Sequence, residues 1–137
     1  MVTNDVWSVY ERLLDRDWER LNEAQRAVVA ICDLRQEVGS GGFDSYFRYA
    51  GGDHAPYALA ALPSALGKEW AELLGRAMAV FGSSYPTDTD RRREALDMVD
   101  ADARLAALDT GLYELEAASN ADAKLADWLE RRPEVGR

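Results

Sequence analysis

Two clusters of glycine residues bracket four aromatic residues between Gly39 and Gly52, an arrangement that could bind phosphate or stack on bases. The spacing does not match the P-loop, because Asp44, Ser45 and Tyr46 stand where that motif requires Gly, Lys and Ser or Thr. It does not match the dinucleotide-binding motif either, because Asp44 stands in place of the third Gly. We therefore interpret the glycines as helix ends at which backbone segments pack closely.

The aromatic residues of this segment have the spacing of a buried helix face. Phe43, Tyr46 and Phe47 lie at i, i+3 and i+4. Base stacking normally occurs in a basic groove, and Arg48 is the only basic residue nearby. We predict that these three rings pack in the core.

The sequence contains one cysteine and one histidine, which limits the chemistry that it can perform. Cys32 cannot form an intramolecular disulfide, and with His54 it supplies too few ligands for a Cys/His zinc site. Cys32 also ends the apolar run 28–32, where we expect a buried hydrophobic role. A Cys–His catalytic pair would need the fold to bring the two residues together. We predict no catalytic residue, no metal site and no cofactor.

The chain is strongly acidic, and the acidity is uneven. Its 25 Asp and Glu residues against 16 Lys and Arg residues give a formal net charge of −9. Residues 94–137 hold 11 acidic and 5 basic residues, compared with 14 and 11 in residues 1–93. Nucleic acids and anionic membranes are therefore poor partners, and proteins with a basic surface are better ones. No apolar run approaches the length of a membrane span, and the N-terminus lacks the features of a signal peptide, so we expect a cytoplasmic protein.

Acidic residues recur at helical spacing in the second half of the chain. Asp90, Glu94 and Asp97 lie at i, i+4 and i+7, and a second row with a spacing of seven lies beside the seam of Leu105 and Leu112. Members of this second row are candidates for pairing with Arg from a neighbouring helix. The predicted partner-binding residues are Asp88, Asp90, Glu94, Asp97, Asp100, Asp102, Asp109 and Glu116.

The spacing of these acids allows two interpretations. Acids on one helix face have Cβ atoms about 5–6 Å apart, the scale of charges along a nucleic-acid backbone, which rises about 3.4 Å per charge along each strand. The functional interpretation is a surface that imitates phosphates. The alternative is a solvated acidic face that keeps the protein soluble.

Nearly every segment has a helical period and no run alternates as a strand would, so the expected fold is all-α. We predict a compact single domain over residues 1–137, a bundle of about six to eight short helices. Pro63 removes an amide donor, which places a kink or break between Leu62 and Gly67. The expected helices cover about residues 7–21, 23–38, 43–50, 53–62, 70–81, 88–99, 105–115 and 121–131, with Gly39 ending the second and Asp53 capping the fourth.

Five blocks of sequence occur in the order GGFDSYFRYAGGDHAPYALAAL, LGKEWAELLGRAMAVFG, YPTDTDRRREAL, LAALDTGLYEL and LADWLERRP. Over roughly residues 21–133 they resemble the bacterial DNA-mimic domain family. The family's G-G-[FL]-x-x-[YF]-[FL] signature is matched by Gly41, Gly42, Phe43, Tyr46 and Phe47. The resemblance implies an all-helical single domain without catalysis or cofactor, in which the signature residues are structural. It also implies an acidic surface that occupies the DNA-binding face of a regulator. The chain departs from the family at Pro63, and Arg91, Arg92 and Arg93 interrupt its acidity.

The acidity and the resemblance together predict a non-enzymatic binding protein of bacterial origin. Its expected partner has a basic surface and is a DNA-binding protein, such as a transcription regulator, or a nuclease. We expect no direct binding of nucleic acid or membrane, and a homodimer formed through an apolar face stays open. The alternative functions are an immunity or toxin-neutralising protein and a helical domain without mimicry whose partner is unknown.

Overall fold

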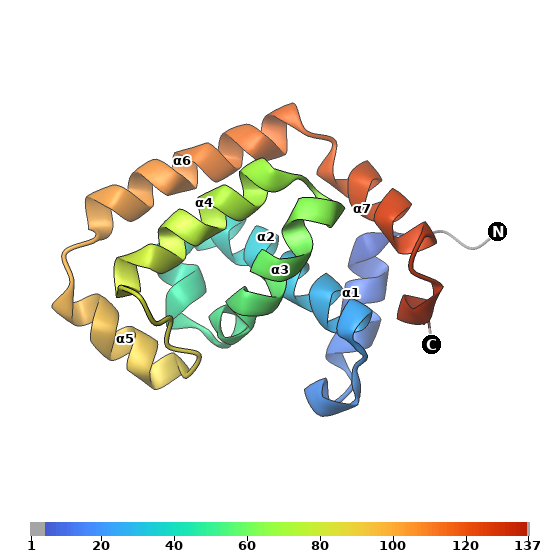
Figure 1. The fold of residues 1–137 in the computed structure, drawn as a ribbon, viewed down its shortest axis with the longest axis horizontal. Coiled ribbons are helices and arrows are strands. Elements are labelled where there is room, and N and C mark those ends of the chain that lie inside the picture. The colour runs from blue at the N-terminus through green and yellow to red at the C-terminus, as the bar shows by residue number, and fades with distance from the viewer. Residues whose placement is uncertain (1–4, 137) are drawn as a thin grey trace.

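The fold consists of α-helices joined by short connections (Figure 1). The computed structural model describes residues 5–136; residues 1–4 and 137 of the predicted domain lie outside this range. Within it there are seven α-helices and no strand, which confirms the predicted all-α fold. The α-helices are α1 (Val6–Leu14), α2 (Glu23–Arg48), α3 (Ala55–Ala65), α4 (Lys68–Met78), α5 (Thr89–Met98), α6 (Asp102–Ala118) and α7 (Ala121–Glu130). Short 3-10 helices cover Trp18–Arg20, Ala50–His54, Ala79–Phe81 and Pro133–Gly136.

Helix α2 lies at the centre of the fold and contacts α1, α3, α5 and α6. Residues 27–32 of α2 are all buried, because this stretch is apolar on every side of the helix. Helices α3 and α4 pack against each other, and α6 packs on both α4 and α2 (Figure 1). The buried apolar side chains from all seven α-helices form one connected core. Helix α5 lies at the end of the molecule opposite α1 and α7 (Figure 1).

The prediction that Gly39 ends the second helix is wrong. Helix α2 continues through Gly39 and is interrupted at Gly42, which has φ +80° and ψ 177°. The helical conformation then resumes at Phe43 and ends at Arg48, which agrees with the short aromatic helix expected here. A positive φ of this size is unfavourable for every residue with a Cβ, so a glycine is required at this position.

The first helix is shorter than predicted. Helix α1 ends at Leu14, and Asp17 has an extended conformation with ψ 132°. The periodic pattern continued to Leu21 because the 3-10 helix Trp18–Arg20 brings two more apolar residues back toward the core. Leu21 is buried there, and Trp18 stacks on His54 instead of extending α1.

The chain breaks between Leu62 and Gly67, as predicted, although Pro63 itself lies inside α3. The helix continues two residues beyond Pro63 and stops where Gly67 has φ +126°. The N–H groups of Leu66 and Gly67 both donate to the carbonyl of Leu62 at 2.9 Å. Pro63 lies in the last turn of α3, where it removes one backbone hydrogen bond shortly before the helix ends.

The remaining predicted helices agree with the structure. Helix α4 with the 3-10 helix after it, α5 and α7 each match the expected range within two residues, and α6 spans the expected leucine seam. The expected cap of the fourth helix is wrong: His54, not Asp53, precedes α3, and Asp53 bonds to residues of α5. Within the described residues, no helix combines the length and the apolarity needed to cross a membrane.

Candidate functional site

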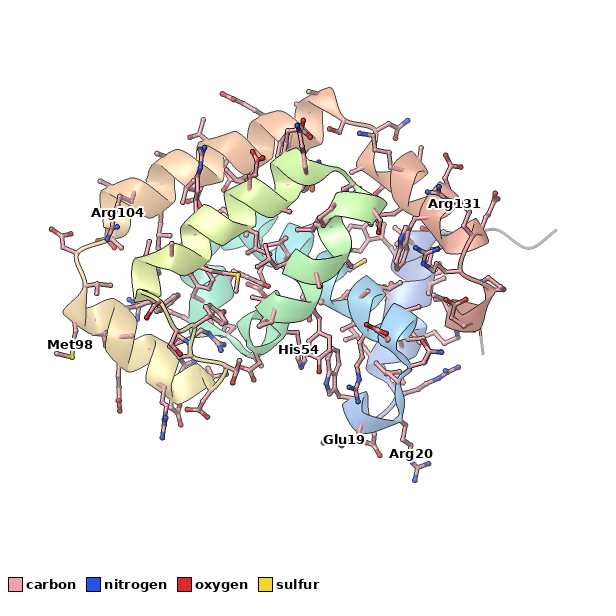
Figure 2. All side chains as sticks on the ribbon, viewed as in Figure 1. Glu19, Arg20, His54, Met98, Arg104 and Arg131 are labelled. Carbon is pink, nitrogen blue, oxygen red and sulfur yellow. The ribbon has the colours of Figure 1, made fainter. Side chains whose placement is uncertain are left out.

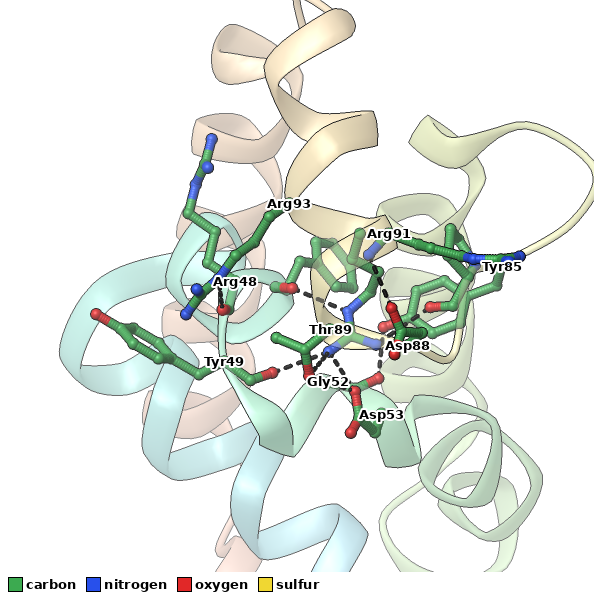
Figure 3. A network of polar contacts seen from close by, with 12 residues as sticks. Arg48, Tyr49, Gly52, Asp53, Tyr85, Asp88, Thr89, Arg91 and Arg93 are labelled. Atoms are coloured by element: carbon green, nitrogen blue, oxygen red, sulfur yellow. Dashed lines mark hydrogen bonds and ion pairs between the residues drawn. The ribbon is translucent and has the colours of Figure 1, made fainter.

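A buried arginine attaches α5 to the rest of the fold (Figure 3). The Arg92 side chain is fully buried, and its guanidinium donates to the carbonyls of Phe47 at 2.9 Å, Tyr49 at 2.9 Å and Pro86 at 3.1 Å. It also forms an ion pair with Asp53 at 2.7 Å. Burying a charge is costly unless its hydrogen-bonding groups find partners, and Arg92 has five, the fifth being the Thr89 hydroxyl at 3.4 Å. These contacts fix the position of α5 against the end of α2.

The second glycine cluster makes this attachment possible. A Cβ at Gly52 would lie 2.6 Å from the carbonyl oxygen of Tyr46 and 3.1 Å from the guanidinium of Arg92. The Tyr85 hydroxyl donates to the carbonyl of Gly52 at 2.6 Å, and the Thr89 hydroxyl donates to Asp53 at 2.8 Å (Figure 3). The glycine therefore has a packing role here, as the spacing argument predicted.

Six of the eight predicted partner-binding residues are exposed on α5, in the connections that flank it and at the first residue of α6. We call them the α5 acidic surface: Asp88, Asp90, Glu94, Asp97, Asp100 and Asp102. Two of the six make polar contacts within the fold. Asp88 caps α5 by accepting from the N–H of Arg91 at 3.0 Å, and Asp97 pairs with Arg48 at 3.1 Å. The carboxylates of Asp90, Glu94, Asp100 and Asp102 form no hydrogen bond or ion pair with the residues that the structure describes.

The three arginines within this segment reduce its acidity less than the sequence suggested. Arg92 is buried and paired. The Arg93 guanidinium donates to the carbonyl of Arg48 at 2.6 Å and lies over the ring of Tyr49. One of the three positive charges, that of Arg92, is therefore buried and paired with Asp53, while Arg91 and Arg93 are exposed like the carboxylates.

Asp109 and Glu116 lie apart from the α5 acidic surface and hold α6 to α2. The Asp109 carboxylate accepts from the N–H of Phe43 at 2.7 Å. Glu116 binds the guanidinium of Arg35 through two hydrogen bonds of 2.8 Å, and Asp122 of α7 binds the same group at 2.9 Å. The predicted pairing of this row with an Arg of a neighbouring helix is confirmed. The partner-binding role of the eight acids stays a prediction.

Burial and hydrogen bonding shift the pKa values of Asp109 and Arg35. Partial burial raises the pKa of Asp109 above its ordinary value, and the bond from Phe43 acts in the opposite direction. Burial acts to lower the pKa of Arg35, but the hydrogen bonds to Glu116 and Asp122 outweigh it and raise that pKa. Arg35 therefore stays charged in its buried position.

The structural importance of Arg92 and Arg35 was missed from the sequence, although a signal was present. Arg92 precedes Leu96 by four residues, which places both on the inner side of α5. Arg35 follows Ile31 by four residues and so lies on a buried side of α2. A charged residue at a core position of a helix predicts an internal ion pair.

The three aromatic residues of the family signature lie in the core, whereas Gly41 is exposed. Phe43, Tyr46 and Phe47 are fully buried, which confirms the expected packing role. The centroids of the Phe43 and Phe47 rings are 5.9 Å apart, and Phe47 also contacts Phe81 edge-on at 5.0 Å. The aromatic side chains of the signature therefore pack in the core near the end of α2, the helix that α5 contacts.

The cysteine and the histidine lie in different environments. Cys32 is buried, and burial raises the pKa of its thiol to about 12, so the thiolate is not populated near neutral pH. His54 stacks on Trp18. Among residues 5–136, no group of three or more His, Cys, Asp or Glu side chains is placed to hold a metal ion.

A comparison with protein families matches residues 19–132 to the family model described as DMP19-like protein. This range contains α2 to α7 and therefore the signature residues, both glycine clusters and the α5 acidic surface. No curated protein and no solved structure matches the chain.

Proposed function

Because the chain belongs to the DMP19-like protein family, a family of DNA mimic proteins, we propose that it is a non-enzymatic protein that occupies the DNA-binding face of a basic protein. The proposed contact is the α5 acidic surface. The partner would be a transcription regulator or another DNA-binding protein, because such proteins present Arg and Lys side chains arranged to contact successive phosphates.

The observation that carries this proposal is the set of exposed carboxylates on α5 that have no cation partner among the described residues. Asp90 and Glu94 lie one helical turn apart, so their Cβ atoms are about 5–6 Å apart. Asp100 follows in the connection after α5, and Asp102 is the first residue of α6. A carboxylate that is already paired would lose that partner on binding, whereas these groups bind a guanidinium or ammonium without that loss.

The rigid attachment of α5 supports the same function. A mimic must present its charges at set positions before the partner arrives, since ordering a segment during binding reduces affinity. The five polar contacts of the Arg92 guanidinium provide that order from the buried side. No contact on the outer side is needed to hold α5 in place.

The experiment is a competition assay with a partner captured on the immobilised protein at low salt. The purified partner should bind either its DNA or this protein, and raising the salt concentration should weaken the complex because both surfaces are charged. Simultaneous binding of DNA and this protein, or binding that does not depend on salt, would contradict the proposal.

Two sets of neutralising substitutions test the surface itself. The first replaces the unpaired acids of the α5 acidic surface: Asp90→Asn, Glu94→Gln, Asp100→Asn and Asp102→Asn. The matched control removes the same number of charges from exposed positions elsewhere: Glu19→Gln, Glu69→Gln, Glu72→Gln and Glu130→Gln. We expect the first set to abolish competition with DNA and the control set to reduce it only slightly. If both sets reduced competition with DNA equally, the net charge alone would determine the binding.

A further inference from the structure

A pocket of about 310 Å³ lies far along the chain from α5, between α1, the turn that follows it, α2 and the 3-10 helix Ala50–His54. Leu13, Leu14, Leu21 and Val29 make much of its lining apolar. Asp33 contributes a carboxylate, and Trp18 with His54 forms a wall. Arg16 also lines it. A small apolar pocket with a few polar groups is the usual form of a small-molecule site.

Asp33 is the charged acceptor in this pocket. The Tyr10 hydroxyl donates to its Oδ1 atom, and a carboxylate has acceptor capacity for further donors. Burial raises the pKa of Asp33 to about 6, so near neutral pH the carboxylate is mostly charged in apolar surroundings. A carboxylate that is charged although burial raises its pKa is typical of functional positions.

The backbone leaves space beside this carboxylate. A Cβ at Gly51 would lie 3.2 Å from the Cβ and 3.4 Å from the Cγ of Asp33, so any larger residue would crowd the carboxylate. Gly51 belongs to the second glycine cluster, whose other member, Gly52, is required by the Arg92 network. Gly51 makes no such contact, and its lack of a side chain keeps the pocket open at Asp33.

The aromatic wall is flat, and the guanidinium of Arg26 lies over the Trp18 ring, 5.1 Å from its centroid. The rings of Trp18 and His54 are stacked with centroids 3.6 Å apart and an interplanar angle of 8°. Figure 2 shows His54 between the start of α3 and the turn that carries Glu19 and Arg20. Its Nδ1 atom is buried and has no hydrogen-bond partner among the described residues. Burial lowers the pKa of His54, so the ring is neutral near neutral pH and does not repel a cation.

We propose that this pocket binds a small apolar molecule with one primary ammonium group, the ammonium contacting Asp33 and the hydrocarbon packing against Leu13, Leu14 and Trp18. The charges are complementary, and a charge-assisted hydrogen bond in apolar surroundings is stronger than one in water. The volume suits an amine with a short branched or unbranched chain. The site is independent of the proposed DNA mimicry, because it contains no residue of α5.

The probe is isoamylamine, titrated near neutral pH into the full chain while amide and indole resonances are followed by NMR. We expect saturable shifts at Asp33, Gly51 and the Trp18 indole, and weaker binding of isoamyl alcohol, which has the same hydrocarbon without the charge. No saturable shift at these residues, or equal binding of amine and alcohol, overturns the proposal.

Two variants and a control make the test specific. Asp33→Asn keeps an acceptor for Tyr10 but loses the charge, and should weaken amine binding about tenfold or more. Leu14→Lys places an ammonium at the exposed rim without changing the core, and should also weaken binding. Asp127→Asn, at an exposed position on α7, should leave affinity unchanged. Unchanged affinity in both pocket variants overturns the proposal.

Discussion

The carboxylate of Asp109 on α6 accepts a hydrogen bond of 2.7 Å from the backbone N–H of Phe43, so a residue distant in sequence caps the helix that restarts after Gly42. The first N–H groups of a helix have no partner within the helix, and a carboxylate there satisfies one of them. This contact joins the signature segment to α6 and gives Asp109 a structural role.

Replacing Asp109 with Ala should therefore destabilise the fold. We expect a loss of about 1–2 kcal/mol in the free energy of unfolding, the usual effect of removing a helix cap. Asp109→Asn should recover part of it, because the amide oxygen can still accept from Phe43. Urea denaturation measures both, with Asp127→Ala as the exposed control. A loss no larger than that of the control would contradict the capping role.

Two glycines of the same cluster should respond to alanine in opposite directions. Gly42→Ala places a Cβ at φ +80° and 2.5 Å from Oδ2 of Asp109, which should cost at least about 1–2 kcal/mol. Gly39 lies within the helix, and a Cβ added there would meet no atom within 4 Å, so Gly39→Ala should stabilise by about 0.5–1 kcal/mol. Thermal denaturation followed by circular dichroism compares the pair. If both substitutions changed the stability in the same direction, α2 would not be interrupted at Gly42.

Among the consecutive arginines, Arg92 should matter far more for stability than Arg91. Arg92→Met removes the ion-pair partner of Asp53 and the donor to several carbonyls, and should cost about 3–5 kcal/mol. Arg91 is exposed, and Arg91→Met should change stability by less than about 0.5 kcal/mol. Equilibrium unfolding in urea distinguishes them, and similar effects would argue against the buried network.

The buried carboxylate of Asp33 predicts an unusual dependence of stability on pH. Its pKa is about 6 in the folded protein, above the ordinary value of 3.8 expected after unfolding. Between these two values the folded state binds more protons than the unfolded state, so this group's contribution to stability falls as pH rises. Tyr10 faces the carboxylate from α1, and Glu37 adds negative charge from α2.

Asp33→Asn should remove that contribution. Near neutral pH the variant should be more stable than the parent by about 1–2 kcal/mol, less than the pKa difference alone would give because solvent screens a partly exposed group. Below about pH 3 the two proteins should be equally stable, since Asp33 is then mostly protonated in both states. Urea denaturation across this pH range measures the difference, and a constant difference would contradict the assignment.

The helices with local boundary signals could be predicted from the sequence. Asp88 before α5 and Gly82 after the 3-10 helix Ala79–Phe81 mark ends that depend on neighbouring residues alone. The end of α1 could not be predicted, because a 3-10 turn kept Trp18 and Leu21 in phase with the preceding helix. The sequence does not tell whether Gly39, Gly41 or Gly42 interrupts α2. The interruption lies at Gly42, where Asp109, far away in sequence, accepts from the next N–H, that of Phe43.

The candidate site could also be predicted only in part, because some of its features depend on contacts between distant segments. The spacing of Asp90 and Glu94 on one helix depends on sequence alone. Whether an acid is available to a partner depends on which cations the fold brings to it. Asp97 meets Arg48, and Glu116 meets Arg35, across contacts between different helices. The pocket at Asp33 combines four segments and has no local pattern.

The inner side of α5 has a consequence for protein engineering. Arg92 and Leu96 are the buried residues of this helix. The outward positions can therefore be exchanged as a block while the anchor stays intact, so that α5 serves as an interchangeable recognition element on a fixed scaffold. New side chains at positions 90, 94, 97 and 98 could redirect the protein to a different target without redesign of the core.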